Sequence, residues 1–227
     1  MTVQETYDWQ VLRERMVQEQ LAARQITDPR VLAAMREVPR HLFVADELKH
    51  LAYRDSPLPI GSEQTISQPF IVAYMTQALE LTGQETILEV GTGSGYQTAI
   101  LCRLAKYVYS IERHNLLAEQ AAARLDTLGF HNVEFHVGDG SQGLPDMAPF
   151  DAILVSAAAP ALPIALRSQL AEGGRLVLPI GDSQNQYLER VRRIGNAWHM
   201  ERLMPVMFVL LIGRNGFGQR STGTAER

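Results

Sequence analysis

Apolar and polar residues follow two different patterns along this chain, and the pattern changes near residue 84. Before that point, apolar residues recur at the spacing of a helix. After it, short apolar runs alternate with helical stretches, as in repeated βα units. We therefore predict a helical annex with a substrate-covering segment over residues 1–83, a core over residues 84–213 and a flexible tail over residues 214–227, within one structural domain.

The annex is predicted to contain helices over residues 8–25, 29–38 and 69–81. Asp28 followed by Pro29 is the pair expected at the N-cap and the first position of a helix. Pro39 ends that helix, because a proline nitrogen has no hydrogen to donate. Residues 40–63 are interrupted by prolines and are predicted to form an irregular connector.

The core pattern predicts a parallel sheet with helices on both faces. The predicted strands occupy residues 86–90, 107–112, 133–137 and 152–156, and the predicted helices occupy residues 96–104, 115–128 and 162–170. Four further strand-like segments have no helices between them; they are residues 175–179, 187–194, 198–203 and 206–212. Strands joined without helices pair through hairpins, so this edge of the sheet is predicted to be antiparallel.

Three glycines at alternate positions follow the first predicted strand, in the run Gly91-Thr92-Gly93-Ser94-Gly95. Each lacks a Cβ, which lets the backbone turn tightly and approach a bound molecule. Glu89 lies two positions before Gly91, at the carboxyl end of the strand, where an open α/β sheet binds ligands. The alternative is a tight strand–helix turn that holds no ligand. Three alternate glycines favour a cofactor site.

The spacing within this run distinguishes between cofactors. A dinucleotide fingerprint would place its third glycine at position 96, which is Tyr96, and a phosphate-binding P-loop would place a lysine after Gly95. A pyrophosphate would also meet the carboxylate of Glu89, a like-charge contact. A zwitterionic amino-acid head with a neighbouring sulfonium suits that carboxylate and the loop amides better. The run therefore favours S-adenosyl-L-methionine.

Two further acidic residues follow the next two predicted strands. Glu112 ends the second strand, where a carboxylate can accept hydrogen bonds from both ribose hydroxyls of a nucleoside. Asp139 and Gly140 follow the third strand, where Asp139 is positioned to accept from an adenine amino group and Gly140 permits close approach. The alternatives are a solvated helix cap for Glu112 and an ordinary turn for Gly138-Asp139-Gly140.

Composition narrows the class of protein. The 227 residues carry a net charge of −4, which gives no indication of a large basic surface for binding nucleic acid. Cys102 is the single cysteine and the histidines show no metal-ligand spacing, so no metal site is predicted. The polar N-terminus does not match a signal peptide, and residues 206–212 are too short to span a bilayer. We predict a cytoplasmic enzyme with no nucleic-acid or membrane partner.

The fourth core strand argues against two acceptor classes. It ends in the run Val155-Ser156-Ala157-Ala158-Ala159-Pro160. Methyltransferases acting on base amines usually have Asn or Asp, two prolines and an aromatic residue here. Metal-dependent catechol-type transferases need acidic ligands at this edge. Neither pattern is present, so amine and catechol acceptors are disfavoured.

The segment Gln64-Thr65-Ile66-Ser67-Gln68-Pro69 is a loop entering a helix, and locally Ser67 suits a helix N-cap. Set before the glycine run, however, it resembles the protein-L-isoaspartate O-methyltransferase family. Residues 31–44, 149–160 and 169–179 resemble further motifs of that family, so the resemblance covers about residues 11–212. Leu210, Leu211 and Ile212 depart from it, because the family commonly has proline, leucine and often threonine in the last strand.

This resemblance implies an α/β, Rossmann-like S-adenosylmethionine-dependent methyltransferase fold. It also implies methylation of the free α-carboxylate of L-isoaspartyl residues in damaged proteins and peptides, with S-adenosyl-L-homocysteine as product and without a metal. The ester then loses methanol as it closes to a succinimide, which can reopen to normal aspartate. Ser67 is expected to orient the substrate carboxylate, under a lid formed by the backbone of Gln64, Thr65 and Ile66. The residues expected to bind cofactor are these three lid residues and Glu89, Gly91, Thr92, Gly93, Gly95, Glu112, Asp139 and Gly140.

Two alternatives stay open at this point. One is a carboxyl methyltransferase for a small molecule or a modified peptide, since the annex suits either substrate. The other is a binding module that keeps the fold without its chemistry. Intact Ser67, Glu89, Glu112 and Asp139 argue against the second alternative. The sequence leaves the oligomeric state undetermined.

Overall fold

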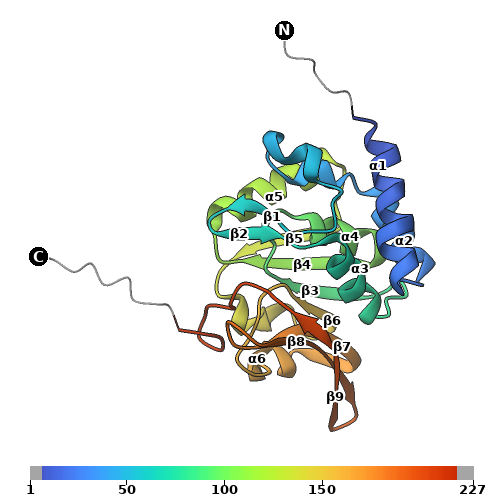
Figure 1. Cartoon of the computed structure of the whole chain (residues 1–227). Coiled ribbons are helices and arrows are strands. Elements are labelled where there is room, and N and C mark those ends of the chain that lie inside the picture. The colour runs from blue at the N-terminus through green and yellow to red at the C-terminus, as the bar shows by residue number, and fades with distance from the viewer. Residues whose placement is uncertain (1–6, 219–227) are drawn as a thin grey trace, which may run out of the picture.

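The computed structural model describes residues 7–218 and is built around one seven-stranded sheet. Its strands run in the order β5-β4-β3-β6-β7-β8-β9. Their bounds are β3 Thr86–Val90, β4 Tyr107–Glu112, β5 Val133–Val137, β6 Phe150–Val155, β7 Leu170–Gly181, β8 Gln186–Ile194 and β9 Ala197–Val206. Strands β3 to β7 pair in parallel, whereas β8 is antiparallel to both of its neighbours. The predicted antiparallel edge is confirmed (Figure 1).

Helices cover both faces of the sheet, as predicted. The core helices are α4 (Tyr96–Leu104), α5 (Asn115–Thr127) and α6 (Ile164–Ser168). From β3 the chain runs through β4 to β5, whereas from β6 it runs the opposite way to β7. Right-handed crossovers therefore place α4 and α5 on one face and α6 on the other. The chain direction switches between β3 and β6, and in open α/β sheets ligands bind beyond the carboxyl ends of strands at such a point.

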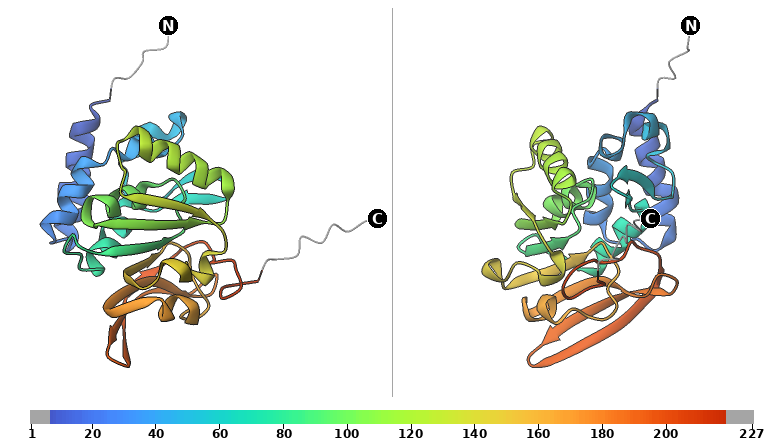
Figure 2. Two further views of the ribbon diagram at one scale, coloured as in Figure 1. Left: turned by 180° about the vertical axis from the view of Figure 1, so that it is seen from behind. Right: turned by 90° about the vertical axis from the view of Figure 1, so that its left-hand side faces the viewer.

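Residues 7–83 pack on the α4 face. They contain α1 (Trp9–Arg15), the π-helix η1 (Met16–Leu21), the 3₁₀ turn η2 (Ala22–Arg24), α2 (Pro29–Glu37) and α3 (Pro69–Ala78). The carboxylate of Asp28 accepts from the backbone N–H of Arg30 and Val31, so the predicted cap of α2 is confirmed. One cluster of buried side chains extends from this annex into α4, β3, β4 and β6. Both views in Figure 2 show the annex lying against the core.

The irregular connector predicted for residues 40–63 is wrong in part. It holds the 3₁₀ helices η3 (Arg40–Phe43) and η4 (Asp46–Leu51), and strand β1 (Leu58–Gly61), which pairs with β2 (Gln64–Ile66). The turn of this hairpin is Ser62-Glu63, and both residues have positive φ, 49° and 57°. Hairpin turns of this kind are normally signalled by Asn-Gly or Asp-Gly. Ser-Glu carries no such signal, which is why the hairpin was not predicted from the sequence.

The predicted last strand, residues 206–212, is also wrong. Strand β9 runs on to Val206, and only isolated bridges follow, Ala158 with Leu210 and Ile212 with Phe217. This segment crosses the ends of the central strands rather than extending the sheet, because Leu211 N–H donates to the Ala158 carbonyl (2.7 Å) beyond β6. Residues 214–218 of the predicted tail hydrogen-bond to the core, with Arg214 N–H donating to Asp139. Residues 219–227 of that tail lie outside the described residues.

Candidate functional site

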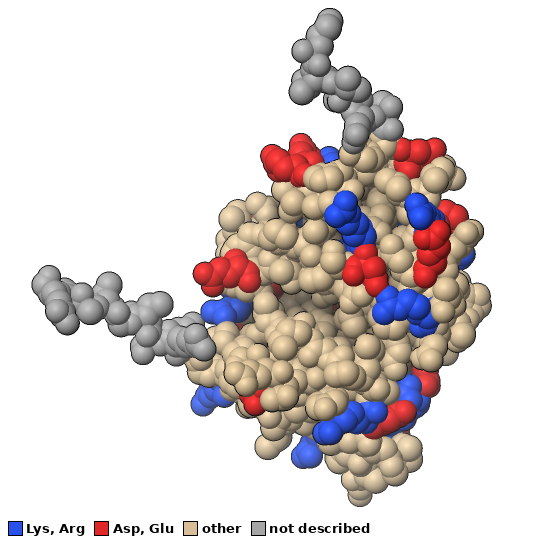
Figure 3. Space-filling view, in the orientation of Figure 1, with Lys and Arg blue, Asp and Glu red and all other residues tan. Residues whose placement is uncertain are grey.

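A cavity of about 740 Å³ lies beyond the carboxyl ends of β3, β4 and β6. Ligand pockets in proteins are typically ~300–1,000 Å³. The hairpin β1–β2, the start of α3, the glycine loop after β3 and residues 204–212 form its walls. Figure 3 shows a hollow near the centre of this face of the molecule, bordered mostly by uncharged surface. The cavity is thus at the switch point of the sheet.

The glycine loop forms the floor of the cavity. Gly91 and Gly93 have φ of 94° and 54°, which L side chains rarely adopt. A Cβ on Gly93 would meet Ile60 Cδ1 at 3.3 Å, because the β1–β2 hairpin lies close above the loop. Gly95 has a different role, since a Cβ there would meet Leu125 Cδ1 at 2.8 Å. Gly95 therefore permits close packing of α5 and does not line the cavity.

Glu112 is a buried carboxylate that faces the cavity, and its oxygens also hold the surrounding backbone. Oε2 accepts from Gly93 N–H at 2.9 Å, and Oε1 accepts from His114 N–H at 3.0 Å. It is 5% exposed and lines the cavity. Each carboxylate oxygen has a second lone pair for a ligand hydroxyl. The alternative of a solvated cap for Glu112 is wrong.

Glu89 lies behind the loop, outside the cavity lining. It is fully buried, and Oε2 accepts from the hydroxyls of Thr98 and Ser110, both at 2.6 Å. Since Ser110 donates to Glu89, it must accept from the hydroxyl of Thr92, 2.6 Å away. Burial raises the pKa of Glu89 to about 7, against the opposing hydrogen bonds and with a smaller contribution from the charge of Glu112. A direct cofactor contact, expected from the sequence, does not fit this placement.

Asp139 is likewise not among the residues that line the cavity. Its carboxylate accepts from the N–H and hydroxyl of Ser141, the amide of Gln142 and the N–H of Arg214. Although burial alone would raise it, these hydrogen bonds hold the pKa of Asp139 below its usual range. Gly140 does line the cavity, and a Cβ there would meet Val90 Cγ1 at 2.5 Å. Asp139 thus shapes the turn that places Gly140.

Ser67 lies between β2 and α3 and lines the cavity. Its hydroxyl makes no hydrogen bond with any residue from 7 to 218, and the N-cap of α3 is Gln68, without a side-chain cap. The local expectation of a Ser67 cap is therefore wrong. Its carbonyl accepts from Arg40 Nη2 at 2.7 Å, and Arg40 Nε donates to the Ala52 carbonyl at 2.8 Å. Burial lowers the pKa of this fully buried arginine to about 10, so it stays charged.

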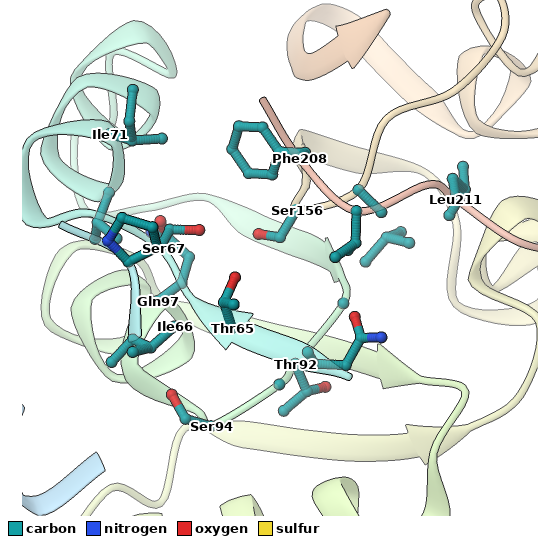
Figure 4. A pocket seen from close by; sticks show the side chains of 18 of the residues that line it. Thr65, Ile66, Ser67, Ile71, Thr92, Ser94, Gln97, Ser156, Phe208 and Leu211 are labelled. Carbon is teal, nitrogen blue, oxygen red and sulfur yellow. The ribbon is translucent and has the colours of Figure 1, made fainter. Parts of the chain in front are cut away.

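Gln97 and Ser156 are cavity residues that the sequence analysis did not select. Gln97 is in the first turn of α4, and Ser156 follows β6. Figure 4 shows their side chains pointing toward one another across the cavity, with Ser67 on the side of Gln97. Only their positions in the sequence, directly after a glycine loop and directly after a core strand, could have indicated a role at the site. Position alone does not show which way a side chain points.

The structure brings most predicted site residues to one cavity. Glu89, Gly95 and Asp139 are the exceptions; Gln64, Thr65, Ile66, Ser67, Gly91, Thr92, Gly93, Glu112 and Gly140 all line it. The opposite wall is the apolar segment from Met204 to Ile212, which includes the departing residues Leu210, Leu211 and Ile212. No group of three or more His, Cys, Asp or Glu residues suited to a metal occurs within residues 7–218.

Comparison with known proteins decides the family. The model of the protein-L-isoaspartate(D-aspartate) O-methyltransferase family matches residues 12–216. The chain belongs to this family. Its relatives include the protein-L-isoaspartate O-methyltransferase of Trichlorobacter lovleyi, 54% identical over 92% of this chain and 97% of that protein. The protein-L-isoaspartate O-methyltransferase 1 of Syntrophobacter fumaroxidans is 55% identical over 92% and 98%.

Solved structures of the family have the same fold. A protein-L-isoaspartate O-methyltransferase has a TM-score of 0.80 at 28% identity, covering 89% of this chain and 66% of its own. A beta-aspartate methyltransferase from Plasmodium falciparum, in complex with S-adenosyl-L-homocysteine, has a TM-score of 0.77 at 26% identity, covering 88% and 98%. The resemblance and fold expected from the sequence are confirmed. No helix within residues 7–218 has both the length and the apolar character needed to cross a membrane.

Proposed function

We propose that this enzyme transfers a methyl group from S-adenosyl-L-methionine to the free α-carboxylate of L-isoaspartyl residues in damaged proteins and peptides. The observation that carries the proposal is the unpartnered Ser67 hydroxyl, which lines the same cavity as a glycine loop whose Gly93 N–H is held by Glu112. In a member of this family, that arrangement supports separate places for a methyl donor and an acceptor carboxylate.

The residues of the cavity fit a nucleoside with an amino-acid head. Gly93 and Gly140 line the cavity at positions where a Cβ would press on Ile60 and Val90, and Glu112 presents carboxylate oxygens for ribose hydroxyls. We assign cofactor contacts to Gly91, Thr92, Gly93, Glu112 and Gly140, and a lid over them to the backbone of Gln64, Thr65 and Ile66. Glu89, Gly95 and Asp139 are assigned supporting positions behind this surface, for the reasons given above.

In the proposed mechanism, the protein aligns the methyl donor and the acceptor and does not act as an acid or a base. The cofactor, when bound, supplies a methyl group activated on a sulfonium. The acceptor carboxylate is ionised at pH 7 and needs no general base, because an unperturbed carboxyl has a pKa near ~4. The Ser67 hydroxyl donates to one carboxylate oxygen and leaves the other free to attack. Arg40 fixes the Ser67 backbone, and the β1–β2 hairpin excludes water, so that the reacting atoms meet in line.

The partners, location and domain roles of the enzyme are proposed on the same basis. We propose that damaged proteins with isoaspartyl residues are the partners, and that nucleic acids and membranes are not; the net charge of −4 supports this. We also propose that the enzyme is cytoplasmic. Residues 1–83 are proposed to act as annex and lid on the core 84–213 within one structural domain, supported by their shared cluster of buried side chains.

The proposal is tested by methyl transfer to two matched peptides, one with L-isoaspartate and one with L-aspartate at the same position. Tritiated S-adenosyl-L-methionine labels the ester, and base-labile volatile radioactivity measures it. The aspartyl carboxylate is displaced by one methylene, and about 1 Å of misplacement costs on the order of 100-fold. We expect at least that ratio in favour of the isoaspartyl peptide. Equal labelling would refute repair specificity and favour a general carboxyl methyltransferase.

A further inference from the structure

The side chain of Gln97 has one end held by the protein and one end free in the cavity. Its Nε2 lies 2.9 Å from Thr76 Oγ1, and its residue is 9% exposed. Thr76, on α3, uses its own hydroxyl hydrogen on the Val72 carbonyl at 2.8 Å. Thr76 must therefore accept from Gln97, and only the amide nitrogen can donate. This fixes the orientation of the amide.

The fixed orientation turns Oε1 of Gln97 away from Thr76. This oxygen accepts no hydrogen bond from any residue between 7 and 218, and it is not sealed from the cavity. Figure 4 shows the side chain of Gln97 across the cavity from Ser156. A carbonyl oxygen is an acceptor only, so the group that completes it must be a donor. The acceptor carboxylate of the substrate is not a donor, whereas the amino-acid head of the cofactor carries a charged donor, its α-ammonium group.

We infer that Gln97 Oε1 accepts a hydrogen bond from the α-ammonium group of bound S-adenosyl-L-methionine; this inference rests on the proposed function. Gln97 is two residues beyond Gly95, so it adjoins the loop over which the amino-acid head would lie. The sequence had offered Glu89 as the acidic partner of that head. Glu89 is behind the loop and engaged by Thr98 and Ser110. Gln97 supplies at the cavity surface the acceptor that Glu89 does not.

Calorimetry with two ligands tests the inference without methyl transfer. S-adenosyl-L-homocysteine carries the ammonium, and its deaminated analogue lacks it. Gln97→Leu keeps the size of the side chain but has no acceptor. A hydrogen bond to a charged group typically contributes ~1.5–3 kcal/mol. We therefore expect the affinity of Gln97→Leu for S-adenosyl-L-homocysteine to be about 10- to 150-fold lower. Affinity for the deaminated analogue should change less than about twofold.

Two variants control the experiment. Gln84→Leu makes the same substitution at an exposed position outside the cavity and should leave both affinities unchanged. Thr76→Val removes the acceptor that orients the amide, so it should lower affinity for S-adenosyl-L-homocysteine in the same direction as Gln97→Leu but less. It also keeps the test available if Gln97→Leu does not fold.

Three results would overturn the inference. The first is an equal loss of affinity for both ligands, which would make Gln97 a support of cavity shape. The second is unchanged binding of S-adenosyl-L-homocysteine to a folded Gln97→Leu variant. The third is a raised KM for isoaspartyl peptide without any loss of that binding, which would assign the oxygen to the substrate. None of these depends on peptide discrimination by the unmodified enzyme, so failure of the proposed function shows separately.

Discussion

The two ends of the cavity treat their polar groups in opposite ways. At the glycine-loop end, Glu112 already binds the backbone N–H of Gly93 and His114, and Thr92 is tied through Ser110 to Glu89. At the other end, the hydroxyl of Ser67 has no partner among the described residues. We propose that the first end is a preassembled frame for the cofactor. The second end leaves its hydrogen-bonding capacity to the acceptor substrate.

At the glycine-loop end, the largest effect is expected from a substitution of Glu112. Glu112→Ala removes the acceptor for ribose hydroxyls and leaves two backbone N–H groups near the loop without their partner. Hydrogen bonds to a charged group are worth ~1.5–3 kcal/mol, so S-adenosyl-L-homocysteine should bind about 10- to 150-fold more weakly in calorimetry. Unchanged affinity would show that the glycine-loop end does not hold the cofactor through this carboxylate. The thermal midpoint of the variant serves as the control for folding.

Glu89 is expected to make the stability of the folded protein depend on pH. Its folded pKa, raised by burial to about 7 from 4.5, means that the folded protein keeps a proton that the unfolded chain loses. Between these values, raising the pH therefore favours unfolding. We expect Glu89 to lower the free energy of unfolding by about 2–3 kcal/mol between pH 5 and 8.

Glu89→Gln should remove this dependence, since an amide does not titrate. Urea unfolding of both proteins at several pH values measures the difference, and parallel pH curves would contradict the assignment. The same variant should bind S-adenosyl-L-homocysteine nearly as well as the unmodified enzyme, in contrast to Glu112→Ala. That contrast would separate the carboxylate that faces the cavity from the one behind it.

The frame was predictable from sequence, whereas the acceptor end was predictable only by resemblance. Alternate glycines after an apolar strand, and Glu112 at the end of the next strand, follow from how parallel strands present their carboxyl ends. The direction of a side chain does not follow from that rule. Glu89 and Asp139 were therefore expected at the cavity surface, but neither of them lines the cavity. The β1–β2 hairpin escaped because Ser62-Glu63 is an unusual turn. Ser67 suggested a helix cap until the fold placed Gln68 there.

The hairpin gives the smallest expected effect. Glu63 adopts φ of 57°, a region that costs a non-glycine residue ~1–2 kcal/mol. Glu63→Gly relieves that cost but adds chain entropy to the unfolded state, so we expect a net stabilisation of about 0.5–1 kcal/mol. Thermal unfolding measures it, with methylation kinetics as the check that the lid still closes. A lowered midpoint would mean that the Glu63 side chain stabilises the turn in another way.

The division between the two ends is tested most directly on Ser67→Ala, with three measurements on one preparation. We predict that kcat/KM for an isoaspartyl peptide falls about 10- to 150-fold, the equivalent of ~1.5–3 kcal/mol for one hydrogen bond to a charged acceptor. S-adenosyl-L-homocysteine affinity and the thermal midpoint should stay unchanged, because the hydroxyl hydrogen-bonds to neither the glycine loop nor the start of α3. Normal turnover, or a loss of cofactor affinity equal to the loss of turnover, would contradict the account.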